Sequence, residues 1–291
     1  MKKTWLLWIL SILITLFAAY YQRSTGPTNP KNVQTAVAES TYTLTYPRSL
    51  RTVITPEQAQ GDWEALLKTT TLRIRVKAKD GVPPFPADIP MHLYYKRARS
   101  VGDWEVAEAL FKHEGRIEAV LPSQPPAGKL AYYLEIDGVS LFQDSPIIVR
   151  FRNNVPAWAL IPHILFMYVA MLLSTLCGFL ALRNDIRWKK YAKLTVATLL
   201  IGGLILGPII QKFAFGAYWT GWPLGDDLTD TKTLIAAAFW VVALIFSTKK
   251  PGRWLAIAAA VALLTIFSIP HSTSGSEFNY ETGLVGTEGK N

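Results

Sequence analysis

The run Ala157-Trp-Ala-Leu-Ile-Pro-His-Ile-Leu-Phe-Met-Tyr-Val-Ala-Met-Leu-Leu-Ser-Thr-Leu-Cys-Gly-Phe-Leu-Ala-Leu182 decides the architecture, because it contains no Asp, Glu, Lys or Arg. A helix that spans a bilayer needs roughly 20 such residues. Further apolar runs occur at Trp5–Tyr21, Leu194–Ile210, Leu234–Phe246 and Trp254–Ile269. The run at 234 is short, so it either reaches spanning length through residues 230–233 or forms a re-entrant or buried helix. The sequence therefore predicts a multi-pass membrane protein.

The distribution of charge predicts an orientation. The formal charge is +9, and ten cations beside the apolar runs, opposed only by Asp185, account for all of it. These cations are Lys2, Lys3, Arg183, Arg187, Lys189, Lys190, Lys193, Lys249, Lys250 and Arg253. They fall at the ends that five antiparallel spans would place on one side, which the positive-inside bias makes cytoplasmic. We therefore expect a bacterial inner-membrane protein with a cytoplasmic N-terminus, a periplasmic C-terminus and no nucleic-acid partner.

The first 40 residues are interpreted as an anchor and a linker. Residues 1–21 begin like a secretory signal, but Leu16-Phe-Ala-Ala-Tyr-Tyr21 lacks a convincing cleavage site, so we expect an uncleaved transmembrane anchor. A cleaved signal is the alternative. Residues 22–40 are polar, contain Gly26, Pro27 and Pro30, and predict a linker.

Residues 41–153 predict an all-β domain on the periplasmic side. Several short segments alternate apolar and polar residues. In the segment Leu72-Arg-Ile-Arg-Val-Lys77, one face would be apolar and the other cationic, as a half-buried strand requires. Six or seven such strands between Pro/Gly turns favour a β-sandwich, and Trp104 is interpreted as one of its core residues, with a sugar contact as the alternative. The only cysteine, Cys177, lies outside this domain, so its stability must come from packing.

One stretch of this domain carries a family resemblance. It combines Met91-His-Leu-Tyr-Tyr95, Asp103-Trp-Glu-Val106 and the segment from Arg116 to Gly138. This pattern resembles the immunoglobulin/fibronectin-III-like modules of exported bacterial proteins. The resemblance covers roughly residues 71–152 and implies a fold only, because such modules serve many binding and spacer roles.

Residues 154–271 predict a four-helix transmembrane bundle, followed by a periplasmic tail at 272–291. Gly203-Leu-Ile-Leu-Gly207 is a small-xxx-small pattern that would let another helix approach closely. The bundle resembles bacterial inner-membrane proteins that carry Ile-Pro-His-Ile-Leu-Phe-Met and Trp-Pro-Leu-Gly-Asp-Asp type segments, a resemblance that implies architecture and no activity.

Several polar residues from remote segments are predicted to meet at the periplasmic membrane level. They are His163, His271, Asp226, Asp227 and Asp230, with Trp219 and Trp222 as interfacial anchors. In one interpretation these residues form a solvated loop in which Asp230 caps the following helix. In the other, His163, His271, Asp226 and Asp227 hold a divalent metal, or the two histidines hold copper or haem. Both interpretations stay open on the sequence.

Two functions are consistent with these features. The first is a non-enzymatic protein whose sandwich binds or positions an envelope or membrane-protein partner, with the bundle as its anchor in the lipid bilayer. The second is a redox or metal-handling membrane component that uses the His/Asp site. No nucleophile elbow accompanies His271-Ser272, so hydrolysis is not expected.

Overall fold

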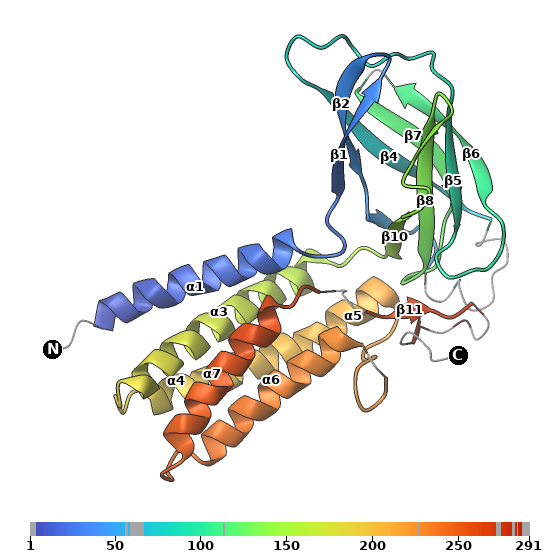
Figure 1. Cartoon of the computed structure of the whole chain (residues 1–291). Helices are drawn as coiled ribbons and strands as arrows, with labels where there is room; N and C mark the ends of the chain where they lie inside the picture. Colours follow the sequence, from blue (N-terminus) through green and yellow to red (C-terminus); the bar gives the residue numbers. More distant parts are fainter. Residues whose placement is uncertain are drawn as a thin grey trace. The chain divides into compact units, whose positions relative to one another are not determined.

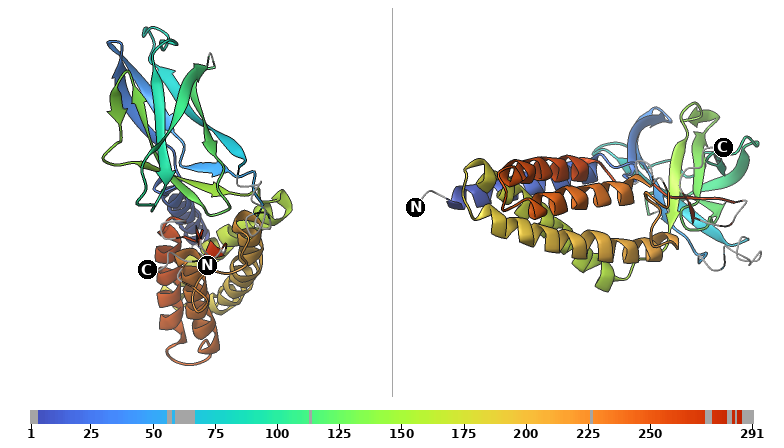
Figure 2. Two further views of the ribbon diagram at one scale, coloured as in Figure 1. Left: turned by 90° about the vertical axis from the view of Figure 1, so that its right-hand side faces the viewer. Right: turned by 90° about the horizontal axis from the view of Figure 1, so that it is seen from below.

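The chain folds into two compact units. The computed structural model describes residues 4–55, 58, 67–112, 114–225, 227–271, 275–280, 283 and 285–286. A helical unit comprises Met1–Pro27, Val155–Ser276 and Gly286–Asn291, and a sheet unit comprises Thr28–Asn154 and Glu277–Val285. Figures 1 and 2 show the helices and strands of each unit.

The sheet unit contains ten strands of one continuous sheet. Their bounds are β1 Lys31–Val37, β2 Ser40–Tyr46, β3 Ser49–Arg51, β4 Thr69–Ala78, β5 Met91–Arg97, β6 Glu105–Lys112, β7 Arg116–Pro122, β8 Lys129–Ile136, β9 Val139–Leu141 and β10 Ile147–Arg152. The order is β1-β2-β4-β7-β6-β5-β8-β10-β3, with β9 beside β8. Every pair is antiparallel except β10 with β3. The two short strands β11 Glu277–Phe278 and β12 Val285–Gly286 follow the helices.

The predicted sandwich, and with it the immunoglobulin/fibronectin-III-like fold, is wrong. A sandwich needs two sheets packed face to face, whereas these strands form one path that curls into a half-barrel, seen at the upper right of Figure 1. The strands themselves were predictable, because each has one buried face. Apolar and polar residues alternate along a strand in the same way whether its buried face packs on a second sheet or on the far side of one curled sheet. The sequence pattern therefore did not distinguish a sandwich from a curled sheet.

The concave side of the curled sheet holds the core. On β4, Leu72 and Ile74 are fully buried while Arg73 and Arg75 are exposed, so the predicted alternation is confirmed. Large side chains dominate the cluster, including Tyr42, Leu44, Tyr46, Leu93, Tyr132 and Phe151. Trp104, predicted in the core, lies outside this cluster. It is half-buried and meets Tyr133 edge-on, at 4.9 Å between ring centroids.

The predicted linker is also partly structured. Helix α1 continues to Ser24, and the edge strand β1 occupies Lys31–Val37, within the residues 22–40 that were assigned to a linker. The Gly and Pro residues lie between these elements, where they separate a helix from a strand.

The described residues of the helical unit form seven helical segments. They are α1 Thr4–Ser24, α3 Ala157–Leu182, α4 Trp188–Leu199, the π-helix η2 Leu200–Leu206, α5 Gly207–Phe215, α6 Leu228–Ile245 and α7 Gly252–Ser268. Within the part of the chain that the structure describes, four helices are long and apolar enough to cross a membrane: α1, α3, the continuous Trp188–Phe215 segment and α6. The short fourth run does gain length at its N-terminal side, because α6 begins at Leu228. The fifth run forms α7, which has 17 residues.

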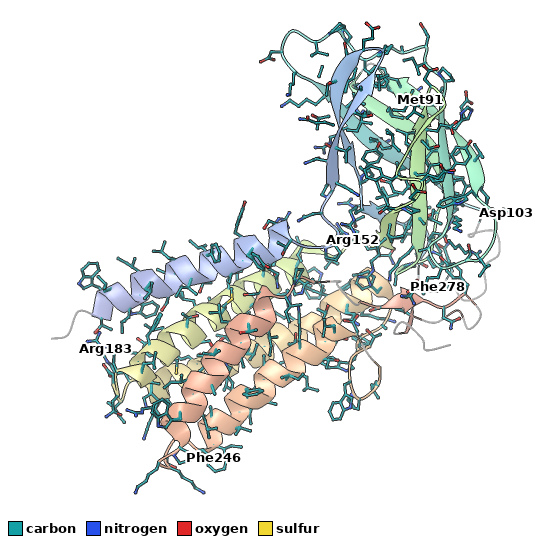
Figure 3. The ribbon with its side chains drawn as sticks, viewed as in Figure 1. Met91, Asp103, Arg152, Arg183, Phe246 and Phe278 are labelled. Carbon is teal, nitrogen blue, oxygen red and sulfur yellow. The ribbon has the colours of Figure 1, made fainter. Side chains whose placement is uncertain are left out.

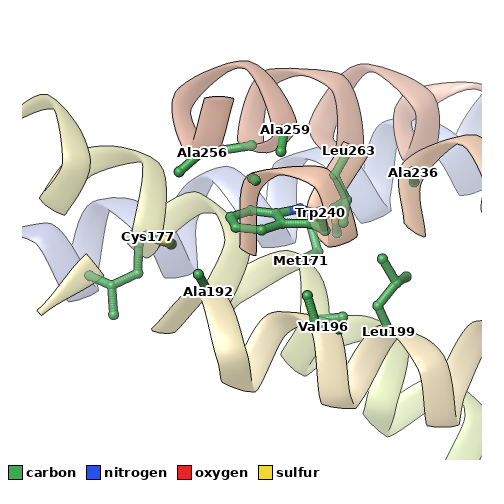
Figure 4. Close-up of a cluster of buried hydrophobic side chains, with 14 of the residues drawn as sticks. Met171, Cys177, Ala192, Val196, Leu199, Ala236, Trp240, Ala256, Ala259 and Leu263 are labelled. Atoms are coloured by element: carbon green, nitrogen blue, oxygen red, sulfur yellow. The ribbon is translucent and has the colours of Figure 1, made fainter. Parts of the chain in front are cut away.

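Small side chains pack the core of the helical unit. Trp240 of α6 is fully buried, with Ala192, Ala256 and Ala259 among the cluster drawn around it in Figure 4. At Gly178 of α3, an added Cβ would lie 2.8 Å from the Cβ of Ala260 on α7. That separation is shorter than real Cβ contacts, so the two helices approach closely because residue 178 is glycine.

Candidate functional site

A buried polar cluster lies where the loop after α5 enters α6. Asp227 is the N-cap of α6, and its Oδ1 accepts a hydrogen bond from the Thr229 backbone N–H at 2.7 Å. Its Oδ2 accepts from both the backbone N–H of Ser276, at 2.7 Å, and the Ser276 hydroxyl, at 2.6 Å. Asp227 is only 4% exposed and Ser276 is fully buried. One carboxylate therefore caps a helix and also holds a segment that lies beyond the last helix.

Asp230 does not have its predicted role. It lies in the first turn of α6, and its Oδ2 accepts from the backbone N–H groups of Thr220, at 2.8 Å, and Gly221, at 3.2 Å. An added Cβ at Gly221 would lie 2.5 Å from the Cβ of Asp230, so only glycine fits beside this carboxylate. The sequence suggested the wrong cap because Asp227 and Asp230 both precede apolar residues, and only the backbone conformation distinguishes them. Asp230 fastens the loop, and Asp227 caps the helix.

Two neutral side chains complete the cluster. The Thr220 hydroxyl receives a hydrogen bond from Gln211 Nε2 at 2.5 Å and lies 3.0 Å from the Ser276 hydroxyl. It also lies 3.3 Å from Asp227 Oδ2. Gln211, Thr220 and Ser276 are all buried. The cluster thus joins α5, the loop, the start of α6 and residue 276.

A buried cation lies one turn further along α6. Lys232 is 3% exposed, and its Nζ donates to the Ile269 carbonyl at 2.7 Å. It also interacts electrostatically with Asp227. This contact satisfies a carbonyl just after α7, where no following helical turn supplies a donor. Lys232 therefore ties the end of α7 to α6.

The two predicted histidines lie on one region of the helical unit. His163 Nδ1 is 2.9 Å from the Gly202 carbonyl, and because a carbonyl accepts, Nδ1 carries the proton and Nε2 does not. The Gly202 carbonyl lies in η2, and a π-helical turn inside a longer helix is often found at functional sites. His271 follows α7 and keeps an exposed surface. Even so, desolvation among dense protein atoms, with Lys232 and His163 nearby, lowers the pKa of His271 to about 4.

The predicted metal ligands do not form a cluster of three or more among the described residues. Among them, no group of three or more His, Cys, Asp or Glu side chains is placed to share an ion. His163, His271 and Asp227 share a region, but both oxygens of Asp227 already accept hydrogen bonds. Asp226, the fourth predicted ligand, lies outside the described residues. The metal, copper or haem site therefore stays a prediction that rests on two histidines.

The remaining predicted residues have separate roles. Trp219 donates its indole N–H to the Gly221 carbonyl at 2.9 Å, and Trp222 is 64% exposed. Their placement as interfacial anchors stays a prediction. At Gly203 an added Cβ would lie 2.7 Å from Thr233 Cγ2, so this glycine brings η2 close to α6. Gly207 meets only the carbonyl of Gly202, at 3.8 Å, so the predicted packing role belongs to Gly203.

Sequence reasoning missed Gln211, Thr220, Lys232 and Ser276. Lys232 could have been found from the sequence. It lies just before the apolar run Leu234–Phe246, whereas the other cations beside that run, Lys249 and Lys250, lie after it. The other three are common polar residues. Their contacts join positions up to 56 residues apart, and no local pattern reports such contacts.

Comparison with known proteins assigns no reaction to this cluster. No protein-family model and no curated protein matches the chain. Chemically, the carboxylates act as acceptors of backbone and hydroxyl protons, and the Ser276 hydroxyl donates to Asp227, with no imidazole between them to act as a base. This arrangement holds the α5–α6 loop and residue 276 in place.

Proposed function

We propose that the chain is a non-enzymatic protein of the bacterial inner membrane, whose sheet unit binds or positions an envelope partner and whose helical unit is its anchor. The observation that carries this proposal is that the buried polar groups of the helical unit are bonded within that unit. Asp227, Asp230 and Lys232 are nearly inaccessible and bonded to groups of their own unit. That leaves the sheet unit as the part with surface to offer a partner.

The connections between the units support an anchoring role. Six residues separate α1 from β1, and four separate β10 from α3. A chain of six residues spans at most about 20 Å. The sheet unit is therefore inserted between two apolar helices on short connections, as a domain held near a membrane surface would be.

Site-specific cross-linking in native membranes tests the proposal. A photoreactive residue at exposed sheet positions, such as Leu110 or Gln34, should give an adduct with a second protein. The same residue at lipid-facing Phe239 of α6, which is 44% exposed, should give none. Adducts from Phe239 alone, with none from the sheet, would refute the proposal that the sheet unit binds the partner and the helical unit is the anchor.

The proposed orientation has its own test. Val101 of the sheet unit is fully exposed, and Lys250 lies exposed in the turn between α6 and α7. Cysteines placed at these two positions should differ in their reactivity in intact spheroplasts. Position 101 should react with a membrane-impermeant reagent and position 250 should not. The native Cys177 is buried and will not compete. The reverse labelling pattern would place the sheet unit in the cytoplasm.

The alternative is a metal-handling or redox component that uses His163 and His271. One observation favours it: the Nδ1–H of His163 is fixed by a carbonyl, which leaves Nε2 as the free ligand atom, an arrangement common in metal-binding histidines. Metal analysis and a visible spectrum of the purified protein separate the two functions. A stoichiometric metal or a haem band that disappears in His163→Ala would establish the alternative.

A further inference from the structure

The outer face of the sheet unit carries a row of like charges that the fold does not require. Arg75 of β4 pairs in register with Arg116 of β7, and Arg116 pairs in register with Lys112 of β6. All three alternate with buried residues, so they share the outer face. Lys77 adds a fourth cation two residues along β4.

Direct cross-strand neighbours lie about 4.5–5.5 Å apart, and like charges at that spacing destabilise a sheet. The next row along the same strands shows the usual solution. There Arg73 pairs with Glu118, with Nε and Oε1 2.8 Å apart. In the cationic row Arg116 forms an ion pair with Glu114, which neutralises one of the four charges. The row therefore keeps a local excess of positive charge at a cost in folding free energy.

Two exposed apolar side chains lie on the same face, Leu110 in the adjacent row of Arg73 and Glu118, and Val120 in the row beyond it. Leu110 of β6 is 48% exposed and Val120 of β7 is 57% exposed. Both alternate with core residues, so neither fills the concave side. Cations beside exposed aliphatic groups match a protein surface that carries both carboxylates and apolar residues. A polysaccharide or a nucleic acid would use the cations and leave the aliphatic groups in water.

The row lies at the end of the sheet that is remote from the chain connections to the helices. The connections to the helices leave from Lys31 and Arg152, at one end of the sheet. Strand β6 begins near that end, because Glu105 pairs with Tyr95 close to the end of β5. Lys112 lies seven residues further, about 23 Å along the strand. Figure 3 labels Met91 and Arg152 at opposite ends of the sheet, and Lys112 lies toward the end of Met91.

We infer that Arg75, Lys77, Lys112 and Arg116, with Leu110 and Val120, form a docking surface for an acidic protein partner. We call this set the cationic face. The inference rests on the proposed function and names the surface through which the sheet unit acts. Carboxylates of the partner neutralise the row, and its apolar residues cover the two aliphatic side chains.

Binding of defined probes by the purified full-length protein tests the cationic face. The probes are a synthetic peptide of alternating Glu and Leu, and polygalacturonate of similar charge. The peptide should bind with an affinity that falls as salt rises. Arg75→Thr with Lys112→Thr should weaken it about tenfold, because two of the cations that meet the peptide's carboxylates are removed. Arg73→Thr with Glu118→Gln, which removes both members of the ion pair and keeps the net charge, should change it less than twofold.

Two further variants keep the test independent of folding. Glu114→Gln removes the neighbouring acid and should tighten peptide binding, an effect of opposite sign that misfolding cannot mimic. Leu110→Ser should weaken the peptide about fourfold and leave polygalacturonate unchanged. The Arg75→Thr, Lys112→Thr variant should melt no lower than the parent, because it removes repulsion. Equal loss in the Arg73→Thr, Glu118→Gln variant, or polygalacturonate binding as tight as that of the peptide, would overturn the inference.

Cross-linking in native membranes separates this inference from the proposed function. Adducts from Leu110 that vanish in the Arg75→Thr, Lys112→Thr background support the cationic face. Adducts from Gln34 on the edge strand β1, with none from Leu110, overturn the cationic face and leave the proposed function standing. Absence of adducts from both positions overturns both.

Discussion

The two units bury their side chains in different ways. Each has a main core of twenty buried residues, and alanine supplies ten of them in the helical unit but two in the sheet unit. The sheet unit instead fills its concave side with tyrosine, leucine, isoleucine and phenylalanine. The two cores therefore differ in the size of the side chains that they bury.

The proposed location of the helical unit in a membrane would account for this contrast. Removing large apolar side chains from water stabilises a fold by roughly 25 cal/mol per Å², so a domain in water gains from each large residue it buries. Between membrane helices this driving force is absent, because lipid tails are as apolar as leucine, and association depends on close packing. Small residues such as Ala256, Ala259 and Gly178 allow that packing.

The largest expected effect is at Trp240, a large side chain buried in a core that consists mostly of small residues. Trp240→Ala should destabilise the helical unit by about 4 kcal/mol, because it leaves a large cavity among alanines that cannot collapse into it. Unfolding of the detergent-solubilised protein, followed by circular dichroism, measures the loss. Phe239→Ala is the matched control, since Phe239 is 44% exposed and should matter little. Equal losses in both variants would break the comparison.

Leu93→Ala tests the sheet unit in the same experiment. Leu93 is fully buried in the sheet core, so the substitution should cost about 3 kcal/mol and lower the melting of β structure alone. Val106→Ala, at a residue 53% exposed on the neighbouring strand, should cost under about 0.5 kcal/mol. If Leu93→Ala also lowered the helical transition, the two units would not be separate folding units.

Asp227→Ala tests whether polar contacts supplement packing in the helical unit. The substitution removes a helix cap and leaves the Ser276 N–H buried without its acceptor, so a loss of about 2 kcal/mol is expected. Ser276→Ala removes only the hydroxyl and should cost less. A double-mutant cycle measures their coupling, and strictly additive losses would show that the contact contributes nothing.

The smallest expected effect is a pH dependence outside the apolar helices. Hydrogen bonds from Arg187 lower the pKa of Asp185 to about 2, from an ordinary value near 3.8. Since the folded pKa is the lower one, the pair stabilises the fold above pH 3.8, and this contribution is lost as pH falls toward 2. Both side chains are solvent-exposed, so the loss should be small. Asp185→Asn should abolish it. A parent and variant with the same pH profile would show that the pair is inert.

The elements were largely predictable, because periodicity is a local property. The apolar run at 157–182 gives α3 with the same bounds, and the alternation at 72–77 gives β4. Edge strand β1 was missed because its residues Lys31-Asn-Val-Gln-Thr-Ala-Val37 are mostly polar or small and follow a Gly/Pro stretch. The curl of the sheet was not predictable, since it depends on pairings such as β4 with β7 between strands remote in sequence.

The polar cluster was predictable only in part. The sequence placed Asp230 at the start of a helix, where acceptors are favoured, and Asp227 in the acidic loop before it. It could not assign which one caps, because that choice depends on the backbone of residue 227. Nor could it find Ser276, which meets Asp227 only once the whole bundle is assembled.

One contact of the first helix bears on how the protein is made. Gln22, near the end of α1, donates its side-chain amide to the Phe267 carbonyl, 245 residues later, at 2.6 Å. During translation α1 therefore leaves the ribosome long before its partner exists. The whole sheet unit up to Asn154 is synthesised in between. The helical unit can close only after synthesis has passed α7 and reached Ser276. A chain that stops before α7 would therefore lack the contact that holds the end of α1.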